Sequence, residues 1–247
     1  MGVFRFKHFN VVNERSAMKV NTDGVLLGAA MTIRPGDRRM LDIGTGTGTI
    51  ALMAAQRAGA QGGSNVQDGG VCVDAIDIDE PSATEAARNF EASPWASALR
   101  VYNMSLDEFA AVAAEKYDLI FSNPPYFEDS LTAPDERKST ARHTSEGLSY
   151  RDIFEFAKSH MTEDGRVALV LPADQEAALC RYARMCGIHL FRILRIRTVP
   201  RKMPSRIIAE FSFQRVAAPS EGLLTIQDQG QYTEEYLSLT KDFYLFA

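Results

Sequence analysis

Short apolar runs alternate with longer mixed segments along most of this chain. Runs such as Tyr117–Ser122 are largely apolar, which is typical of parallel strands buried on both faces. The segments between them carry apolar residues at helical spacing. We therefore expect strands leading into Gly44 and at 71–77, 99–103, 117–122, 166–172, 188–197 and 206–214, with helices at 48–58, from Pro81, from Ser105 to near Glu115, and at 150–161 and 174–186.

This alternation predicts a doubly wound, Rossmann-like α/β domain. We expect a seven-stranded, mostly parallel sheet with an antiparallel edge strand, because 188–197 and 206–214 are placed to form a hairpin. The 247 residues suit a single domain. Within it we expect an N-terminal extension at 1–35 that packs on the ligand site, a core at 36–215 and a C-terminal extension at 216–247.

The first 20 residues alternate aromatic and basic side chains. Phe4, Phe6 and Phe9 are interleaved with basic residues, which fits a β-hairpin or an extended arm. We favour an edge strand that packs its phenylalanines on the body. Direct contact of this segment with a substrate is the alternative. Further along, Thr22 or Asp23 is the expected cap of a helix.

Composition narrows the class of protein. The net charge of −5 argues against indiscriminate nucleic-acid binding. Because the first residues include no apolar signal-peptide region, we expect a cytoplasmic protein without membrane contact. The three cysteines form no CxxC pair, so we expect free thiols and no metal site. We also expect a monomer.

Basic residues are concentrated in one segment. Residues 177–209 contain eight Lys or Arg and no Asp or Glu, although acidic residues outnumber basic ones in the chain as a whole. This segment therefore predicts a positive face on an otherwise negative protein. Its basic residues are Arg181, Arg184, Arg192, Arg195, Arg197, Arg201, Lys202 and Arg206.

A glycine-rich stretch at 42–48 predicts a tight turn from a strand into a helix. Gly44, Gly46 and Gly48 remove Cβ atoms where the backbone must bend and approach a ligand. The GxGxG spacing differs from the GxGxxG of nicotinamide and flavin sites. Asp42 disfavours a pyrophosphate and favours a ligand that carries an ammonium and a sulfonium. The stretch resembles motif I of class I S-adenosylmethionine-dependent methyltransferases; an ordinary strand–helix turn is the alternative.

Three polar residues lie at or after the ends of the next two strands. Asp77 ends the strand after the glycine turn, where a carboxylate can accept hydrogen bonds from both ribose hydroxyls. Asp79 is expected to cap the helix that has Pro81 in its first turn. Ser105 begins a capping-box pattern with Glu108, which explains it by structure alone.

The Asn-Pro-Pro-Tyr sequence at 123–126 suits chemistry on a planar nitrogen. The Asn123 side-chain oxygen and the Pro124 carbonyl can accept hydrogen bonds from the two N–H groups of an exocyclic amine or an amide. The prolines stiffen the turn, and Tyr126 offers a ring for stacking. Together with the glycine turn, this sequence predicts an amino-group methyltransferase that works by alignment. A rigid turn without chemistry is the alternative.

Four stretches together resemble a known family. Residues 17–28, 41–52, 123–126 and 231–246 are similar to the bacterial tRNA (adenine-N6) methyltransferases that modify adenosine 37, beside the anticodon of a valine tRNA. The resemblance implies a class I methyltransferase fold, S-adenosylmethionine as cofactor and tRNA as partner. It implies N6-methylation of that adenine as the reaction.

The resemblance also implies roles for individual residues. Lys19, Thr22 and Asp23 would line the methionine end of the cofactor, and Asn123 with Tyr126 would hold the target adenine. Relatives often carry Asp at position 105, so the contact of Ser105 with the cofactor adenine would be weaker or shifted to Asp107. The expected cofactor residues are Lys19, Thr22, Asp23, Asp42, Gly44, Gly46, Gly48, Asp77, Ser105 and Asn123, and the expected catalytic residues are Asn123, Pro124 and Tyr126.

The resemblance suggests a role for the basic segment: its Lys and Arg side chains would contact phosphates along the RNA while the adenine is flipped out into the pocket. The expected RNA contacts are Arg137, Lys138, Arg142, Arg201, Lys202 and Arg206. Solvated faces that aid solubility are the alternative. Rival functions are glutamine-N5 methylation of a protein, N6-adenine methylation of ribosomal RNA or DNA, and cofactor-dependent RNA binding without turnover.

Overall fold

The computed structural model describes residues 2–16, 18–62, 70–125 and 147–247, with the side chains of 60–62 left out. Four residues with predicted roles lie outside these ranges: Tyr126, Arg137, Lys138 and Arg142.

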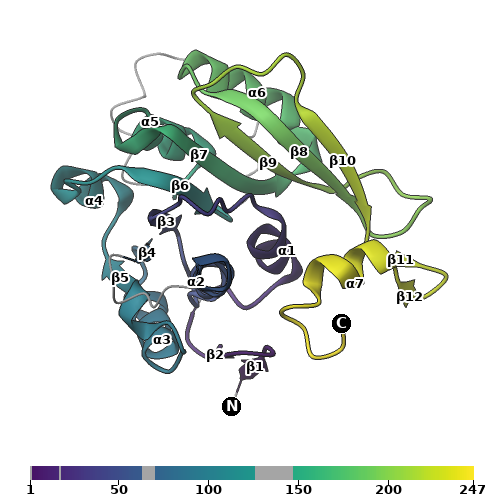
Figure 1. Cartoon of the computed structure of the whole chain (residues 1–247), viewed down its shortest axis with the longest axis horizontal. Coiled ribbons are helices and arrows are strands. Elements are labelled where there is room, and N and C mark those ends of the chain that lie inside the picture. Colours follow the sequence, from purple (N-terminus) through teal and green to yellow (C-terminus); the bar gives the residue numbers. More distant parts are fainter. Residues whose placement is uncertain (1, 17, 63–69, 126–146) are drawn as a thin grey trace.

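An eight-stranded sheet forms the centre of the fold (Figure 1). Its order is β10-β8-β9-β7-β6-β3-β4-β5. The strands are β3 (Arg39–Ile43), β4 (Cys72–Asp77), β5 (Leu99–Asn103), β6 (Tyr117–Ser122), β7 (Met161–Pro172), β8 (His189–Arg197), β9 (Arg206–Ser212) and β10 (Ser220–Thr225). The predicted Rossmann-like alternation is confirmed.

The edge of the sheet differs from the prediction. The β8–β9 hairpin is confirmed, but β9 is antiparallel to both β7 and β8 and so lies inside the sheet. The edge strand is β10, which runs parallel to β8 and makes eight strands in place of seven. Leu224 is buried and Leu223 is half exposed, so this short strand lacks the strong apolar pattern of the central ones.

Helices cover both faces of the sheet. One face carries α1 (Thr22–Ala30), α2 (Thr49–Gly62), α3 (Glu80–Glu91) and α7 (Glu234–Thr240). The other carries α4 (Leu106–Val112), α5 (Tyr150–His160) and α6 (Glu176–Met185). The predicted start of the helix at 174 is a 3-10 turn over Ala173–Gln175, which precedes α6.

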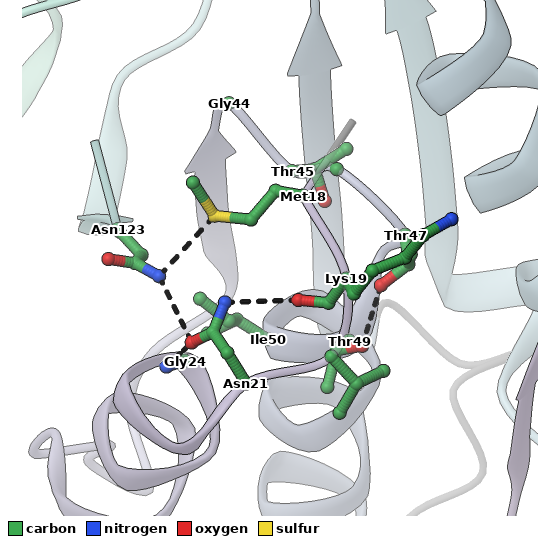
Figure 2. A pocket seen from close by; sticks show the side chains of 12 residues that line it. Met18, Lys19, Asn21, Gly24, Gly44, Thr45, Thr47, Thr49, Ile50 and Asn123 are labelled. Carbon is green, nitrogen blue, oxygen red and sulfur yellow. Dashed lines mark hydrogen bonds between the residues drawn. The ribbon is translucent and has the colours of Figure 1, made fainter. Parts of the chain in front are cut away.

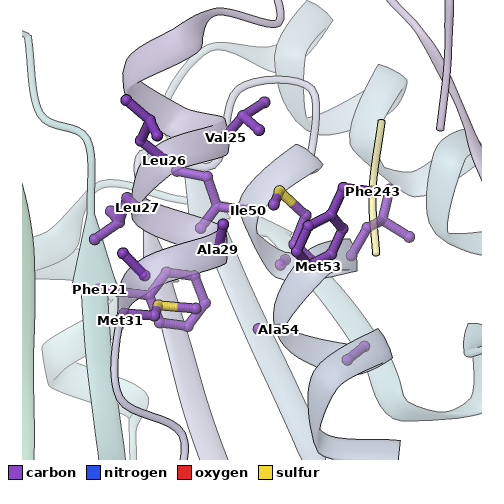
Figure 3. Packing of buried hydrophobic residues seen from close by; sticks show 14 of the residues in the cluster. Val25, Leu26, Leu27, Ala29, Met31, Ile50, Met53, Ala54, Phe121 and Phe243 are labelled. Atoms are coloured by element: carbon purple, nitrogen blue, oxygen red, sulfur yellow. The ribbon is translucent and has the colours of Figure 1, made fainter. Parts of the chain in front are cut away.

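The α1 and α2 helices pack closely on the sheet, and apolar side chains fill the space between them (Figure 3). A Cβ atom on Gly28 would lie 2.7 Å from the Met53 sulfur, so any larger residue at this position would force the Met53 side chain to shift. Met31 and Phe121 are fully buried beneath α1. This packing fixes the N-terminus of α1 beside the carboxyl end of β3.

Helix caps define where several helices begin. Asp79 caps α3 by accepting from the Ser82 N–H, and Ser105 forms the expected capping box with Glu108. The prediction of Thr22 or Asp23 as the cap of α1 was wrong. Asn21 is the cap, and its side chain accepts from the Gly24 N–H at 2.8 Å.

The N-terminal hairpin consists of β1 (Val3–Arg5) and β2 (Asn10–Val12), as the aromatic pattern predicts. Phe6 and Phe9 are buried, with their ring centroids 4.5 Å apart. The Lys7 N–H donates to the Phe243 carbonyl at 2.8 Å, so the two ends of the chain lie side by side (Figure 1).

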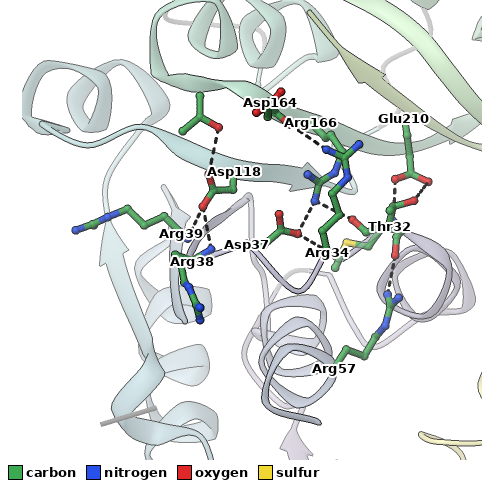
Figure 4. A network of polar contacts seen from close by, with 12 residues as sticks. Thr32, Arg34, Asp37, Arg38, Arg39, Arg57, Asp118, Asp164, Arg166 and Glu210 are labelled. Atoms are coloured by element: carbon green, nitrogen blue, oxygen red, sulfur yellow. Dashed lines mark hydrogen bonds and ion pairs between the residues drawn. The ribbon is translucent and has the colours of Figure 1, made fainter. Parts of the chain in front are cut away.

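A buried polar network lies near the amino end of β3 (Figure 4). The Arg166 guanidinium donates to the Asp37 carboxylate at 2.5 Å and to the Thr32 carbonyl at 3.2 Å. Asp37 is 4% exposed and Arg166 is 1% exposed. A buried pair of this kind is costly to break, because the remaining charge is left without its partner.

We predict that Asp37→Ala lowers the free energy of unfolding by about 3–5 kcal/mol, because Arg166 keeps a buried charge without its carboxylate. Denaturant unfolding measures the change. The matched control is Glu115→Ala, which removes an exposed pair with Arg39 and should cost less than about 1 kcal/mol. Equal effects of the two substitutions would contradict the importance of the buried pair.

Candidate active site

The glycine turn follows the carboxyl end of β3 and is held by the end of β4. The N–H groups of Gly44 and Thr45 both donate to the Ile76 carbonyl, at 2.9 and 3.0 Å. The Gly46 N–H donates to the Asp77 carboxylate at 2.7 Å. The carboxyl ends of β3 and β4 are therefore in direct contact.

The turn has a backbone conformation that favours glycine. The φ angles of Gly44, Gly46 and Gly48 are +72°, +57° and +79°. At Gly48 a Cβ atom would also lie 2.4 Å from the Phe90 ring of α3. These glycines let the chain turn tightly and let α3 pack against it.

A pocket lies over this turn (Figure 2). Its walls are the turn itself, the start of α2, the segment before α1 and the end of β6. The lining residues are Met18, Lys19, Val20, Asn21, Gly24, Gly44, Thr45, Gly46, Thr47, Thr49, Ile50 and Asn123.

Asn123 is 7% exposed and reaches this pocket from the end of β6. Its Nδ2 donates to the Met18 sulfur at 3.7 Å and to the Asn21 side-chain oxygen at 3.5 Å. These contacts orient the amide, and Figure 2 shows its oxygen on the side away from Met18 and Asn21. Pro124, directly after it, is buried.

The structure brings some of the predicted cofactor residues to the pocket wall. Lys19, Gly44, Gly46 and Asn123 are among the lining residues. Asp77 is outside that set, and its carboxylate accepts from the N–H groups of Gly46 and Asp79.

Other predicted cofactor residues are used elsewhere in the described structure. Asp23 accepts from the Arg206 Nε at 2.8 Å, and Thr22 is an exposed residue in the first turn of α1. Ser105 caps α4. None of these three is among the described residues that line the pocket.

Two comparisons of sequence relate the chain to known proteins. The methyltransferase small domain family matches residues 15–180. The tRNA1(Val) (adenine(37)-N6)-methyltransferase of Parabacteroides distasonis is 43% identical over 98% of this chain and 97% of its own length. The protein of the same name from Flavobacterium johnsoniae is 37% identical over 98% and 99%. The chain belongs to this methyltransferase family.

Solved structures agree with this assignment. A structure described as a predicted O-methyltransferase from Agrobacterium tumefaciens has a TM-score of 0.64 at 16% identity, covering 90% of this chain and 96% of that one, which shows the fold alone. TrmN from Thermus thermophilus has a TM-score of 0.51 at 26% identity, covering 77% of this chain and 47% of that one. The predicted methyltransferase fold and enzyme class are thus confirmed.

The sequence interpretation missed several wall residues of this methyltransferase. Met18, Asn21, Thr47 and Thr49 all line the pocket. Thr47 lies between Gly46 and Gly48, and Thr49 directly follows Gly48. The two threonine hydroxyls are 2.8 Å apart. Their position in the turn was the available signal, whereas nothing local indicates that Met18 meets Asn123 from 105 residues away.

Asp42 lies behind the turn and is fully buried. Burial raises its pKa to about 7, against the opposing hydrogen bonds of the Thr45 hydroxyl and the Ala51 backbone, and the nearby Asp77 raises it further. Its Oδ1 makes no hydrogen bond with any described residue. Asp42 is therefore a buried carboxyl group behind the turn that titrates near neutral pH.

The basic segment is less available than its sequence suggests, because acidic residues from other elements meet it. Arg192 pairs with the buried Glu210, Arg195 pairs with two glutamates, and Arg206 pairs with Asp23. Glu176 and Glu210 directly flank residues 177–209, and the other two carboxylates are more distant in the sequence. A count of charges within 177–209 therefore does not reveal these partners.

Arg201 and Lys202 are exposed on the loop between β8 and β9. The β9 strand is antiparallel to both β8 and β7, so β8 and β7 run in the same direction. The β7, β6 and β3 strands are parallel to one another, so β8 also runs in the same direction as β3. The loop after β8 and the glycine turn after β3 therefore lie at the same end of the sheet, where the parallel strands have their carboxyl ends.

Two other kinds of site are absent from the part of the chain that the structure describes. Among the described helices none is long and apolar enough to cross a membrane. No group of three or more His, Cys, Asp or Glu within the described ranges is arranged to hold a metal ion.

We predict that the stability difference between Asp42→Asn and the parent protein depends on pH. The raised pKa means that the folded state keeps a proton between about pH 4 and 7 that the unfolded chain has lost. The parent therefore loses stability as pH rises through this window, by up to about 4 kcal/mol, while the amide does not titrate.

The free energy of unfolding of both proteins is measured in urea at about pH 4.5, near the start of this window, and at about pH 8, above it. The Asp42→Asn variant should gain stability relative to the parent at the higher pH. A difference that stays constant between the two pH values would contradict a buried, titrating Asp42.

Proposed function

We propose that this chain transfers a methyl group from S-adenosylmethionine to N6 of an adenine in tRNA, adenosine 37 of a valine tRNA. The observation that carries the proposal is the placement of the Asn123 amide in the wall of the same pocket as the glycine turn. The names of the full-length relatives support the choice of substrate.

The pocket suits the proposed cofactor by its chemistry. Its wall combines backbone groups of the glycine turn with neutral oxygen-bearing side chains such as Asn21, Thr47 and Thr49. Asp42 and Asp77 lie behind that wall, and Asp42 has a buried oxygen without a described partner. The Asp77 carboxylate, together with the ionised fraction of Asp42, favours a ligand with an ammonium and a sulfonium. The chemistry that such a cofactor would supply is an electrophilic methyl group.

Asn123 would act by orienting the target amine. The lone pair of an exocyclic adenine nitrogen is delocalised, so its reaction depends on alignment. The Asn123 oxygen and the Pro124 carbonyl would accept hydrogen bonds from the two N–H groups and direct the nitrogen at the methyl carbon. Holding the reactants in line is worth up to about 7–11 kcal/mol in favourable cases. The new N–C bond replaces the C–S bond, and the nitrogen then loses one proton to water.

We further propose that Arg201 and Lys202 contact RNA phosphates. Both are exposed, and their loop lies on the pocket edge of the sheet. Arg206, in the same segment, is braced by Asp23. Arg137, Lys138 and Arg142 remain predicted contacts outside the described residues, as does stacking on Tyr126.

The test is transfer of a labelled methyl group to unmodified tRNA, followed by nucleoside analysis. We predict that Asn123→Ala lowers kcat by about 100-fold or more, as losing a key transition-state hydrogen-bonding group does. Asn123→Asp keeps an acceptor oxygen and should retain more activity than Asn123→Ala.

The outcomes separate the rival functions. N6-methyladenosine at position 37 supports the proposal. Label on protein glutamine, or on ribosomal RNA or DNA in preference to tRNA, would replace it with one of the rivals. Full activity of Asn123→Ala would remove Asn123 from the mechanism.

The RNA contact is tested by Arg201→Gln with Lys202→Gln. We predict weaker tRNA binding and a slope of log Kd against log salt that is smaller by about 1–2, because two phosphate contacts are lost. The matched control is Arg38→Gln, an exposed residue at the opposite edge of the sheet. An unchanged salt slope in the double variant would contradict the contact.

A further inference from the structure

Three buried polar residues lie along one face of α3. Ser82, Glu85 and Asn89 are spaced three and four residues apart and are 3%, 3% and 2% exposed. Polar groups are buried at a cost unless they are hydrogen-bonded, so the partners of this face show what it does.

Glu85 holds a segment from the N-terminal part of the chain. Its Oε1 accepts from the N–H groups of Glu14 and Arg15 at 2.7 and 3.0 Å, and its Oε2 accepts from the Ser16 N–H at 3.0 Å. A carboxylate is acceptor-only, which suits three donors. Burial acts to raise the pKa of Glu85, but the three N–H donors outweigh it and hold the pKa below its usual value.

The neighbouring residues on α3 extend this attachment. Asn89 donates to the carbonyls of Val12 and Thr47 and accepts from the Val12 N–H. Ser82 donates to the Ser16 hydroxyl at 2.9 Å. The face therefore joins the segment at 12–16 to the glycine turn.

The attached segment leads directly into the pocket wall. The Ser16 hydroxyl donates to the Met18 carbonyl at 3.0 Å, and Met18 accepts the contact from Asn123. A Cβ on Gly46 would lie 3.5 Å from the Ser16 hydroxyl and 3.6 Å from the Met18 carbonyl, so the segment lies against the turn. We call residues 12–16 and 18–20 the strap.

We propose that Glu85 is a positioning residue, which fixes the strap over the glycine turn so that Met18 and Lys19 complete the cofactor pocket. This inference rests on the proposed function, because it takes the pocket to be the S-adenosylmethionine site. Glu85 is absent from the pocket wall and acts through Ser16 and Met18.

The test uses Glu85→Gln in the full chain. Glutamine has one acceptor oxygen, and its amide group would point N–H donors at a backbone N–H. When the strap is docked in only part of the population, the apparent Kd equals the intrinsic Kd divided by the docked fraction. We predict that the Kd for S-adenosylmethionine, measured by calorimetry, rises about tenfold, which is about 1.4 kcal/mol.

Two further readouts separate positioning from general destabilisation. The KM for S-adenosylmethionine should rise with the Kd while kcat at saturating cofactor stays within about threefold. Hydrogen exchange should accelerate at the amides of Glu14, Arg15 and Ser16, which lose their acceptor.

Two controls complete the experiment. Glu91→Gln removes an exposed carboxylate at the end of the same helix and should bind like the parent. Ile188→Ala lowers stability from the other face of the sheet and should leave the Kd unchanged.

If Glu85→Gln weakens cofactor binding no more than Ile188→Ala, or leaves strap exchange unchanged, the positioning role is overturned. A parent protein that does not bind S-adenosylmethionine would instead overturn the proposed function. The exchange readout needs no cofactor, so the two failures are distinguishable.

Discussion

The contact on which the site depends is the hydrogen bond from the Gly46 N–H to the Asp77 carboxylate. It joins the turn after β3 to the end of β4, while Gly44 and Thr45 donate to the Ile76 carbonyl of the same strand. Because the turn requires positive φ angles, only glycine adopts it without strain. The pocket, the packing of α3 and the docking of the strap all follow from this geometry.

Charge has different roles at the two ends of the sheet. Near the amino end of β3, Arg166 and Asp37 form a buried pair within a network that links β7 to the start of β3. At the carboxyl end, Asp42 is buried, forms no ion pair with any residue that the structure describes, and has its pKa raised by burial to about 7. The first arrangement fixes the fold, whereas the second keeps an ionisable group beneath the proposed cofactor site.

The sequence predicted the features that arise from local pattern. The strand at 117–122, the glycine turn, the cap at Asp79 and the capping box at Ser105 all depend on neighbouring residues. One error is local, since Asn21 caps α1 directly before the predicted Thr22 or Asp23, and the others concern long-range contacts. The short β10 strand has too few apolar residues to stand out, and the partners of Arg192 and Arg206 come from elsewhere in the chain.

The central claim is that the cofactor lies over the glycine turn with its reactive centre facing Asn123. A crystal structure with S-adenosylhomocysteine tests this claim most directly. The account predicts ligand density in contact with Gly44, Gly46 and the strap, with the sulfur directed toward the Asn123 amide. Density elsewhere on the molecule, or a sulfur that faces away from Asn123, would contradict it.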